Sequence, residues 1–385
     1  MIQIEKKARC SGCSACYNSC PVRAIKMTED NEGFLYPSLD ENTCIKCNIC
    51  EKVCPYHSAI EINQDLQACF AGYNTNDDDR AKSSSGGIFI ALARAIIERK
   101  GVVFGSAYDG DFMAMHTYAE SYEELVPLIG SKYMQSRIGN TFHDVKKFLD
   151  EHRTVMFVGS ACQIAGLKKF LQKGYSNLIC VDFICLGVPS AKIWRDYITT
   201  FFQGEKIQRV NFKDKNLGWH DFSLRIDTDK QKFCKNGRDT LFFSGYFNQL
   251  YSRPSCYECI FKNGYRVSDI TISDCWGYHD IAPEMDDNKG LSSIVCHTDK
   301  GLELFESIKD KLVWKEANID DVKKYNSNYC KSATIGKKRN AFWKDYERIE
   351  KEQLFKQYCI KETPDITKRA VKRLKQLIKM IFELI

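Results

Sequence analysis

Apolar and polar positions in the middle of the chain follow a pattern that predicts a parallel sheet. The apolar run at residues 154–158 has the length of a buried strand, and a tight turn at 159–162 leads into an apolar-periodic helix through residue 171. A second apolar run follows at 178–184. Strand, turn, helix and strand within about thirty residues predict a right-handed β-α-β crossover. The turn then lies at the carboxyl end of a parallel strand, where open α/β sheets bind ligands.

The flanking patterns predict further elements of both kinds. Upstream, the serine-glycine stretch at 83–87 leads into an apolar-periodic helix, and residues 102–104 are expected to form a strand. Downstream, residues 190–202 are expected to be helical, while 206–210 and 222–226 alternate like antiparallel strands. The chain therefore combines parallel and antiparallel strands with helices.

Eight of the 19 cysteines form two runs with one spacing near the N-terminus. The runs are Cys10, Cys13, Cys16 and Cys20, then Pro21, and Cys44, Cys47, Cys50 and Cys54, then Pro55. This spacing matches the bacterial two-cluster ferredoxin signature, in which the fourth cysteine ligates the other cluster. We therefore expect one 4Fe-4S cluster on Cys10, Cys13, Cys16 and Cys54, and a second on Cys44, Cys47, Cys50 and Cys20. Zinc sites use pairs of C-x2-C, and disulfides need an oxidising compartment, so these alternatives fit the pattern less well.

Length and charge narrow the class of protein. The 385 residues are enough for two or three units with a large core. The formal net charge of +6 counts cysteines as neutral, but cubes held by thiolates are anionic, so the protein with its clusters is less basic than this charge indicates. We therefore expect no nucleic-acid partner. The first residues show no secretory signal pattern, and no run of 18 apolar residues occurs, so we expect a cytoplasmic protein.

These observations divide the chain into four expected segments. Residues 1–62 form the two-cluster ferredoxin-type module, with a turn at 31–34. Residues 65–150 and 151–325 are two parts of a mixed α/β body, and 326–385 form a helical tail. The expected fold class is therefore α+β or α/β, with a small ferredoxin-like module before the body.

Four cysteines outside the module form a second constellation. Cys162 lies in the strand-to-helix turn, Cys185 follows the next predicted strand, and Cys256 and Cys259 form a lone C-x2-C. A lone C-x2-C is compatible with zinc, a redox pair or half of a cluster site. Buried thiols without a ligand are a further alternative, because free cysteine is among the most buried residue types.

Several short blocks along the chain, taken together, resemble one known family. The blocks are Ser83-Ser84-Ser85-Gly86-Gly87, Ser131-Lys132-Tyr133-Met134-Gln135-Ser136, Gly159-Ser160-Ala161-Cys162-Gln163, Cys185-Leu186-Gly187-Val188-Pro189-Ser190, the C-x2-C, and residues 268–277, which include Asp274 and Trp276. In this order they resemble the β-subunit family of coenzyme F-420 hydrogenases and dehydrogenases. That family also contains a plant hydroxymethyl-chlorophyll reductase and bacterial vinyl reductases. The likeness covers about residues 65–325.

The resemblance implies an FAD-dependent oxidoreductase with a third 4Fe-4S cluster on Cys162, Cys185, Cys256 and Cys259. It implies FAD contacts at Ser85, Gly86, Gly87, Lys132, Tyr133, Gln135, Ser136, Gln163, Asp274 and Trp276. Glycines that open a helix allow a pyrophosphate to approach the backbone. The ordinary alternatives for these blocks are a flexible loop for the serine-glycine stretch and core packing for the aromatic residues. The family usually has Thr-Pro at 160–161, histidine at 186 and glycine at 273, where this chain has Ser160-Ala161, Leu186 and Ser273.

The expected function is electron transfer between the clusters, FAD and an organic substrate, such as a deazaflavin or a polysaccharide or sugar precursor. A ferredoxin or another redox protein would be the electron partner. The alternatives are an adaptor subunit with no substrate of its own and a metal-stabilised scaffold that holds zinc. His220 and His279 are candidate proton donors because they neighbour the family blocks.

The last residues predict a basic amphipathic helix. After Thr363 and Pro364, apolar residues from Val371 to Ile385 fall on one helical face, and lysines and arginines occupy the rest. Such a helix could lie on an anionic membrane surface or dock on a partner. Packing on its own domain is the alternative.

Overall fold

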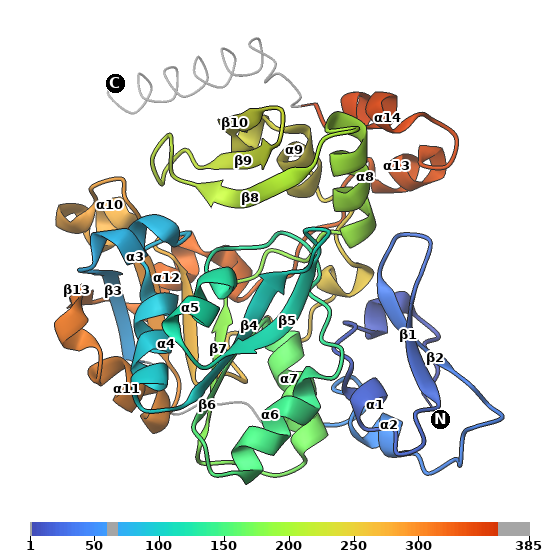
Figure 1. Ribbon diagram of the computed structural model, residues 1–385, viewed down its shortest axis with the longest axis horizontal. Coiled ribbons are helices and arrows are strands. Elements are labelled where there is room, and N and C mark those ends of the chain that lie inside the picture. The colour runs from blue at the N-terminus through green and yellow to red at the C-terminus, as the bar shows by residue number, and fades with distance from the viewer. Residues whose placement is uncertain (1, 60–67, 361–385) are drawn as a thin grey trace, which may run out of the picture.

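The computed structural model describes residues 2–59 and 68–360, which form three units: an N-terminal module, a body around one large sheet, and a smaller sheet with its helices (Figure 1). The predicted amphipathic helix after Pro364 lies outside the described residues. Among the helices described, none has the length and apolar character needed to cross a membrane.

The N-terminal module contains a two-stranded hairpin and two single-turn helices. Its elements are α1 (Ala15–Asn18), β1 (Ile25–Glu29), β2 (Leu35–Leu39) and α2 (Ile49–Lys52). The strands pair antiparallel, and the predicted turn joins them. The Asp30 carboxylate closes this turn by accepting hydrogen bonds from the backbone amides of Glu32 and Phe34 at 3.0 and 2.9 Å, as acidic turn residues commonly do.

The body is built on an eight-stranded mixed sheet with the order β13-β3-β12-β11-β7-β6-β4-β5. Its strands are β3 (Ala68–Asn74), β4 (Val102–Tyr108), β5 (Ala114–Ala119), β6 (Val155–Val158), β7 (Leu178–Phe183), β11 (Ile270–Asp274), β12 (Ser292–Cys296) and β13 (Leu312–Glu316). The central strands β4, β6, β7 and β11 run parallel, and the outer pairs are antiparallel. The predicted crossover is confirmed, because α7 (Ala161–Leu171) connects the parallel neighbours β6 and β7.

Alternating residues of the central strands bury the two faces of the sheet under different helices. Val103 and Met156 pack with α4 (Ile88–Glu98) and α11 (Asp299–Glu306) on one face. Phe104 and Phe157 pack with α6 (Thr141–Asp150) and α7 on the other. This period of two is expected for strands covered on both sides. The remaining body helices are α3 (Asp77–Lys82), α5 (Tyr122–Leu125), α10 (Tyr278–Ile281) and α12 (Ile319–Tyr325).

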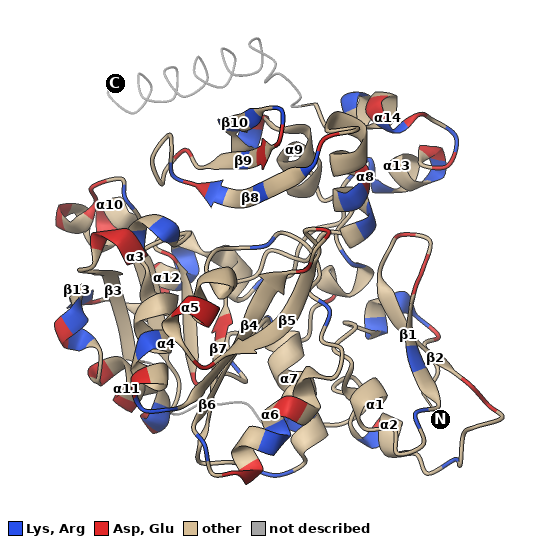
Figure 2. Cartoon of the chain, in the orientation of Figure 1, with Lys and Arg blue, Asp and Glu red and all other residues tan. Residues whose placement is uncertain are grey.

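Helix α3 illustrates how local charge supports these elements. Its first turn consists of Asp77, Asp78 and Asp79, and the Asn76 side chain accepts a hydrogen bond from the Asp79 amide at 3.0 Å (Figure 2). Negative charge at a helix N-terminus complements the helix dipole. The helix thereby starts where the chain leaves β3 and carries Arg80 toward the serine-glycine loop.

The third unit is a small antiparallel sheet with the order β10-β9-β8, which lies above the main sheet in Figure 1. Its strands are β8 (Ile207–Asp214), β9 (Ser223–Thr228) and β10 (Lys232–Asn236), and its helices are α8 (Ala191–Phe201), α9 (Leu241–Phe247), α13 (Arg339–Asp345) and α14 (Lys351–Tyr358). The predicted antiparallel strands and the helix at 190–202 are confirmed here. Helices α13 and α14 share one apolar core with α8 and the small sheet, so residues 339–358 are packed.

Candidate functional site

The two cysteine runs of the module fold with the same local backbone. Each short helix starts after a residue in the left-handed conformation, Ser14 (φ 63°) before α1 and Asn48 (φ 59°) before α2. A second left-handed residue lies two positions earlier, Gly12 (φ 67°) and Lys46 (φ 55°). These turns direct successive cysteines of one run toward a common centre.

The first predicted ligand set is brought together in the structure. Cys10, Cys13, Cys16 and Cys54 line one cavity, together with apolar residues such as Ile2 and Pro37. Burial, together with negative charge on Cys10 and Cys54, raises the thiol pKa of Cys13 to about 12. The fourth member thus comes from the other run, as the ferredoxin spacing predicts.

The second predicted set lies nearer the solvent. Cys50 is buried, Cys20 and Cys44 are half-buried, and Cys47 is exposed. The Ala24 amide donates to Cys20 Sγ at 3.2 Å, and the Lys46 amide donates to Cys44 Sγ at 3.4 Å. Such amide contacts stabilise thiolate charge.

The four cysteines of the body also lie near one another. Cys162 is in the first turn of α7, Cys185 follows β7, and Cys256 ends the short helix η4 (Pro254–Cys256), three residues before Cys259. Burial raises the thiol pKa of Cys256, and charge on each of the other three would raise it further. The Ser160 hydroxyl lies 3.1 Å from Cys162 Sγ, and the Val188 amide donates to Cys256 Sγ at 3.4 Å.

No three Cys, His, Asp or Glu residues in the described part of the chain are arranged to hold a single metal ion. That finding concerns ligands that converge on one ion. A 4Fe-4S cube is a different case, because its thiolates bind separate iron atoms.

The first module set and the body set are adjacent. A Cβ added to Gly166, one turn after Cys162 on α7, would lie 2.8 Å from Cys13 Cβ and 3.0 Å from Cys13 Sγ. Negative charge on Cys162 also acts on Cys13. Helix α7 therefore carries one body cysteine and contacts one module cysteine.

The serine-glycine loop opens α4, as predicted, and contacts the Ser-Lys-Tyr block. The Ser131 amide donates to Ser84 Oγ at 2.8 Å, and Gly87 is the left-handed N-cap (φ 84°) of α4. Ser85 Oγ donates to the Leu291 carbonyl at 2.8 Å. A Cβ on Gly86 would lie 2.6 Å from the Gly72 carbonyl oxygen, so this glycine makes room for the neighbouring backbone.

Two lysines at this loop have a lowered pKa. Burial lowers the pKa of Lys132 to about 7, and its Nζ donates to the Ile129 and Gly130 carbonyls at 3.4 and 3.2 Å. The Tyr108 ring lies 5.2 Å from Lys132 Nζ. The buried hydroxyls of Tyr108 and of Ser106 on the same strand have no hydrogen-bond partner among the described residues. The site thus combines an amine and hydroxyls that are free to contact a polar ligand.

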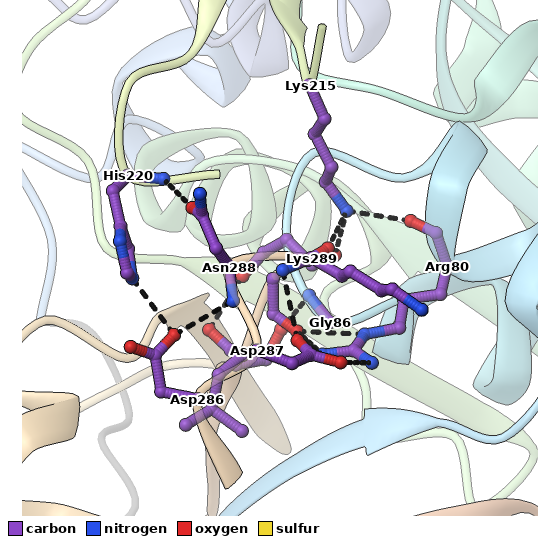
Figure 3. Close-up of polar contacts among 12 residues, drawn as sticks. Arg80, Gly86, Lys215, His220, Asp286, Asp287, Asn288 and Lys289 are labelled. Atoms are coloured by element: carbon purple, nitrogen blue, oxygen red, sulfur yellow. Dashed lines mark hydrogen bonds and ion pairs between the residues drawn. The ribbon is translucent and has the colours of Figure 1, made fainter. Parts of the chain in front are cut away.

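Lys215 also contacts this loop, near Gly86 and Arg80 (Figure 3). Its Nζ donates to the carbonyls of Arg80, Ser85 and Lys289 at 2.6 to 2.7 Å. Burial, and then the positive charge of Arg80, lower the pKa of Lys215 to about 7. Arg80 itself is paired with Asp287 through two hydrogen bonds of 2.8 and 2.6 Å.

Ser136 and Gln163 form part of a buried hydrogen-bond network. His116 Nε2 lies 3.1 Å from the Val158 carbonyl, which can only accept, so Nδ1 is the acceptor for the Ser136 hydroxyl at 2.7 Å. Burial lowers the pKa of His116 to about 4, which keeps this tautomer neutral. Gln163 accepts from the Ser160 amide at 3.0 Å and donates to the Ser136 carbonyl at 3.3 Å, so it caps α7.

Tyr133, Asp274 and Trp276 surround a buried lysine that the sequence pattern did not single out. Lys213 Nζ pairs with Asp274 Oδ2 at 3.0 Å and lies 5.4 Å from the Trp276 ring centre. The Trp219 indole donates to Asp274 Oδ1 at 3.0 Å and stacks on Trp276. β8 mixes apolar, polar and charged residues, so its sequence does not set Lys213 apart from the other charged residues of the strand.

The remaining candidates fall into different surroundings. Gln135 contacts the module: its Nε2 donates to the Ser11 carbonyl at 3.0 Å, and its Oε1 accepts from Arg253 at 2.8 Å. His220 pairs with Asp286 at 2.9 Å and stacks on Tyr278 (Figure 3). The His279 side chain is 60% exposed, next to Asp280.

The carboxyl ends of β6, β7 and β11 therefore gather Cys162, Cys185 and Asp274 at one edge of the sheet, with the loops at 83–87 and 131–136 beside them. A comparison with protein families matches residues 152–336 to the C-terminal region of the coenzyme F420 hydrogenase/dehydrogenase beta subunit. It matches residues 9–58 to the 4Fe-4S dicluster domain. The chain contains, over residues 152–336, the C-terminal region of the coenzyme F420 hydrogenase/dehydrogenase beta-subunit family. It carries an N-terminal 4Fe-4S dicluster domain.

Other comparisons add less to this family assignment. No curated protein matches the chain. A chain of the xenon-derivatised F420-reducing NiFe hydrogenase complex from Methanosarcina barkeri matches with 14% identity, a TM-score of 0.47, and coverage of 72% of this chain and 92% of that chain. This likeness is too low to say anything about function. With this beta-subunit region and a dicluster domain, the chain is an iron-sulfur redox protein.

Proposed function

We propose that this protein is an iron-sulfur flavoprotein oxidoreductase, in which electrons pass between three 4Fe-4S clusters, FAD and an organic substrate. The observation that carries the proposal is the adjacency of the two cysteine sets, with Cys13 of the module packed on Gly166 of α7, one turn from Cys162. Cys162, Cys185, Cys256 and Cys259 would hold the third cluster. A redox protein would exchange electrons with the module.

The residues at the serine-glycine loop suit an anionic cofactor. Lys132 is a poorly compensated amine whose pKa burial lowers to about 7, and a phosphate beside it would favour its charged form. The amides at the start of α4 face the same loop, and helix N-termini attract anions. FAD, when bound, exchanges a hydride with an organic substrate and single electrons with iron-sulfur clusters.

Tyr133 would connect the flavin region to the third cysteine set. Its partly buried ring contacts Phe243 and Tyr246 at centroid distances of 4.9 and 5.5 Å. Burial raises the pKa of the Tyr133 hydroxyl, and the charge of Lys213 partly offsets this effect, so the phenol stays protonated. The Lys213–Asp274 pair would place a buried cation beside Trp276, where it could hold a polar group of the ring.

Metal and flavin content of anaerobically purified protein tests the proposal. Three cubes would give about twelve iron atoms per chain, with one FAD. Cys256→Ser should lower the iron content by about four atoms, whereas Cys234→Ser on β10 should leave it unchanged. If Cys256→Ser has the same iron content as the wild type, the third cluster is refuted. If the purified protein contains no flavin, the proposed FAD binding is refuted.

The substrate class needs a separate assay. Reduced protein would be offered a deazaflavin and, in parallel, sugar precursors, with flavin reoxidation as the readout. Leu186 and Ser273 occupy positions where the family usually has histidine and glycine. If the protein turns over neither class of substrate although its clusters and flavin can be reduced, the result would favour an electron-transfer adaptor.

A further inference from the structure

Arg253 lies buried at the junction between the module and the body. The residue is 1% exposed. Its Nε donates to the Cys10 carbonyl at 2.9 Å, Nη1 to Gln135 Oε1 at 2.8 Å, and Nη2 to the Leu35 carbonyl at 2.9 Å. Nη2 also lies 3.7 Å from Cys10 Sγ, within the range of a hydrogen bond to sulfur.

Every oxygen acceptor around this guanidinium is uncharged. Its partners in the described part of the chain are two carbonyls, an amide oxygen and the Cys10 sulfur, with the Tyr36 ring at 4.3 Å. Arginine keeps its charge in proteins, and a buried charge is costly unless an opposite charge lies near. The nearest atom that can carry negative charge is the sulfur of a predicted cluster ligand.

A second arginine at the same junction is compensated in the ordinary way. Arg339 of α13 forms a two-pronged ion pair with Glu32 in the hairpin turn, and Nε lies 3.2 Å from the Tyr257 hydroxyl. It therefore attaches the module to the body through a carboxylate, without touching a cysteine. The contrast shows that docking alone does not require an arginine placed against Cys10.

The backbone of the first cysteine run is shaped to admit Arg253. A Cβ on Gly12 would lie 2.9 Å from Arg253 Nη1 and 2.7 Å from Gln135 Nε2. Only glycine leaves this space in a left-handed position. Arg253 also precedes Cys256 by three residues, and its charge acts on Cys162, so it lies between the two cysteine sets.

We propose that Arg253 sets the reduction potential of the cluster held by Cys10, Cys13, Cys16 and Cys54, an inference that rests on the proposed ligand assignment. Reduction adds one electron to this cube, with no bond made and no proton taken up. The extra negative charge is stabilised by the adjacent guanidinium and its hydrogen bond to Cys10 Sγ. Arg253 therefore makes this cluster easier to reduce, because hydrogen bonds and nearby charges tune cluster potentials.

The test is a redox titration of the holoprotein with dithionite, followed by electron paramagnetic resonance. Arg253→Met should shift the midpoint of one module cluster to more negative potential, with iron content unchanged. Arg253→Lys keeps the charge and should shift it less. Arg339→Met removes the neighbouring docking contact and should leave all midpoints at their wild-type values.

Gln135→Glu provides a variant that leaves Arg253 in place. It has nearly the same shape and puts a carboxylate on Nη1, which neutralises the cation, so the midpoint should again become more negative. Unchanged midpoints in Gln135→Glu would overturn the proposal, even where Arg253→Met fails to fold. Wild-type protein with fewer than about eight iron atoms would instead overturn the cluster assignment on which it rests.

Discussion

The two cysteine runs of the module share one spacing and one backbone conformation but occupy different surroundings. Gly12 in the first run and Lys46 in the second hold equivalent places, both with positive φ. Gly12 is buried against Arg253 and Gln135, whereas Lys46 is exposed. Because lysine adopts this conformation in the second run, the turn does not itself demand glycine. Glycine is required at position 12 because the body approaches the backbone closely there.

The difference gives the two runs different roles in the proposed electron path. The first set has no exposed cysteine, since Cys54 is buried and the other three are half-buried, and it touches α7 of the body. The second set has an exposed Cys47, and the neighbouring Ile45 is 60% exposed. We expect an external redox protein to reach the second set, because the first is covered by this chain itself.

Exchanging the equivalent residues should give the largest effect. Gly12→Lys introduces a Cβ 2.9 Å from Arg253 Nη1 and a second buried cation, so we expect loss of the first cluster, about four iron atoms per chain. The reverse change, Lys46→Gly, removes the strain of a lysine in the left-handed conformation. Glycine loses more backbone entropy on folding, which offsets this gain, so the net effect on the free energy of unfolding should be near zero. Equal iron loss in both variants would remove the contrast between the runs.

Oxidative damage should distinguish the two clusters without any mutation. Limited treatment with ferricyanide should destroy the exposed second cluster several-fold faster than the enclosed first one, because solvent exposure controls access. Electron paramagnetic resonance of dithionite-reduced aliquots would follow both signals. Simultaneous loss of the two signals would contradict the enclosure of the first set.

The contact between module and body can be loosened at one helix position. Gly166→Ala adds a methyl group 2.8 Å from Cys13 Cβ and should destabilise docking by about 1 to 3 kcal/mol, despite the better helix propensity of alanine. Gly174→Ala is the matched control, because nothing lies within 4 Å of its added Cβ. Thermal unfolding of the holoprotein would measure both, and a Gly166→Ala protein as stable as the control would show that the contact adapts freely.

The smallest expected effect is a pH dependence in the body. Lys132 has a pKa lowered to about 7 by burial, whereas in the unfolded chain it stays protonated to much higher pH. The unfolded state therefore binds more protons above pH 7, and the stability of flavin-free protein should rise as the pH increases from about 7 to 10. Lys215, whose pKa is also lowered to about 7, adds to the same rise. Lys132→Met should therefore reduce the rise in thermal midpoint without abolishing it, and exposed Lys173→Met should leave it unchanged. Added FAD should reduce the rise in the wild type as well.

Sequence spacing determined those features that depend on neighbours along the chain. The β6-α7-β7 crossover, the antiparallel strands β8 and β9, and the helix after the serine-glycine stretch all follow from local apolar periodicity and turn residues. That Cys54 lies beside Cys10, Cys13 and Cys16 was also predictable, because the repeated spacing implies it.

Tertiary structure alone decided which long-range partners share these sites. Lys213 of β8 meets Asp274 of β11, and Arg253 meets Cys10, across separations that no local pattern encodes. The same holds for Gly86, which the resemblance gave as an FAD contact, and for Gly12, which the sequence did not single out, because the fold uses both to admit other parts of the chain. Buried charges are compensated by whatever the packing brings near, so their roles are visible only once the units are assembled.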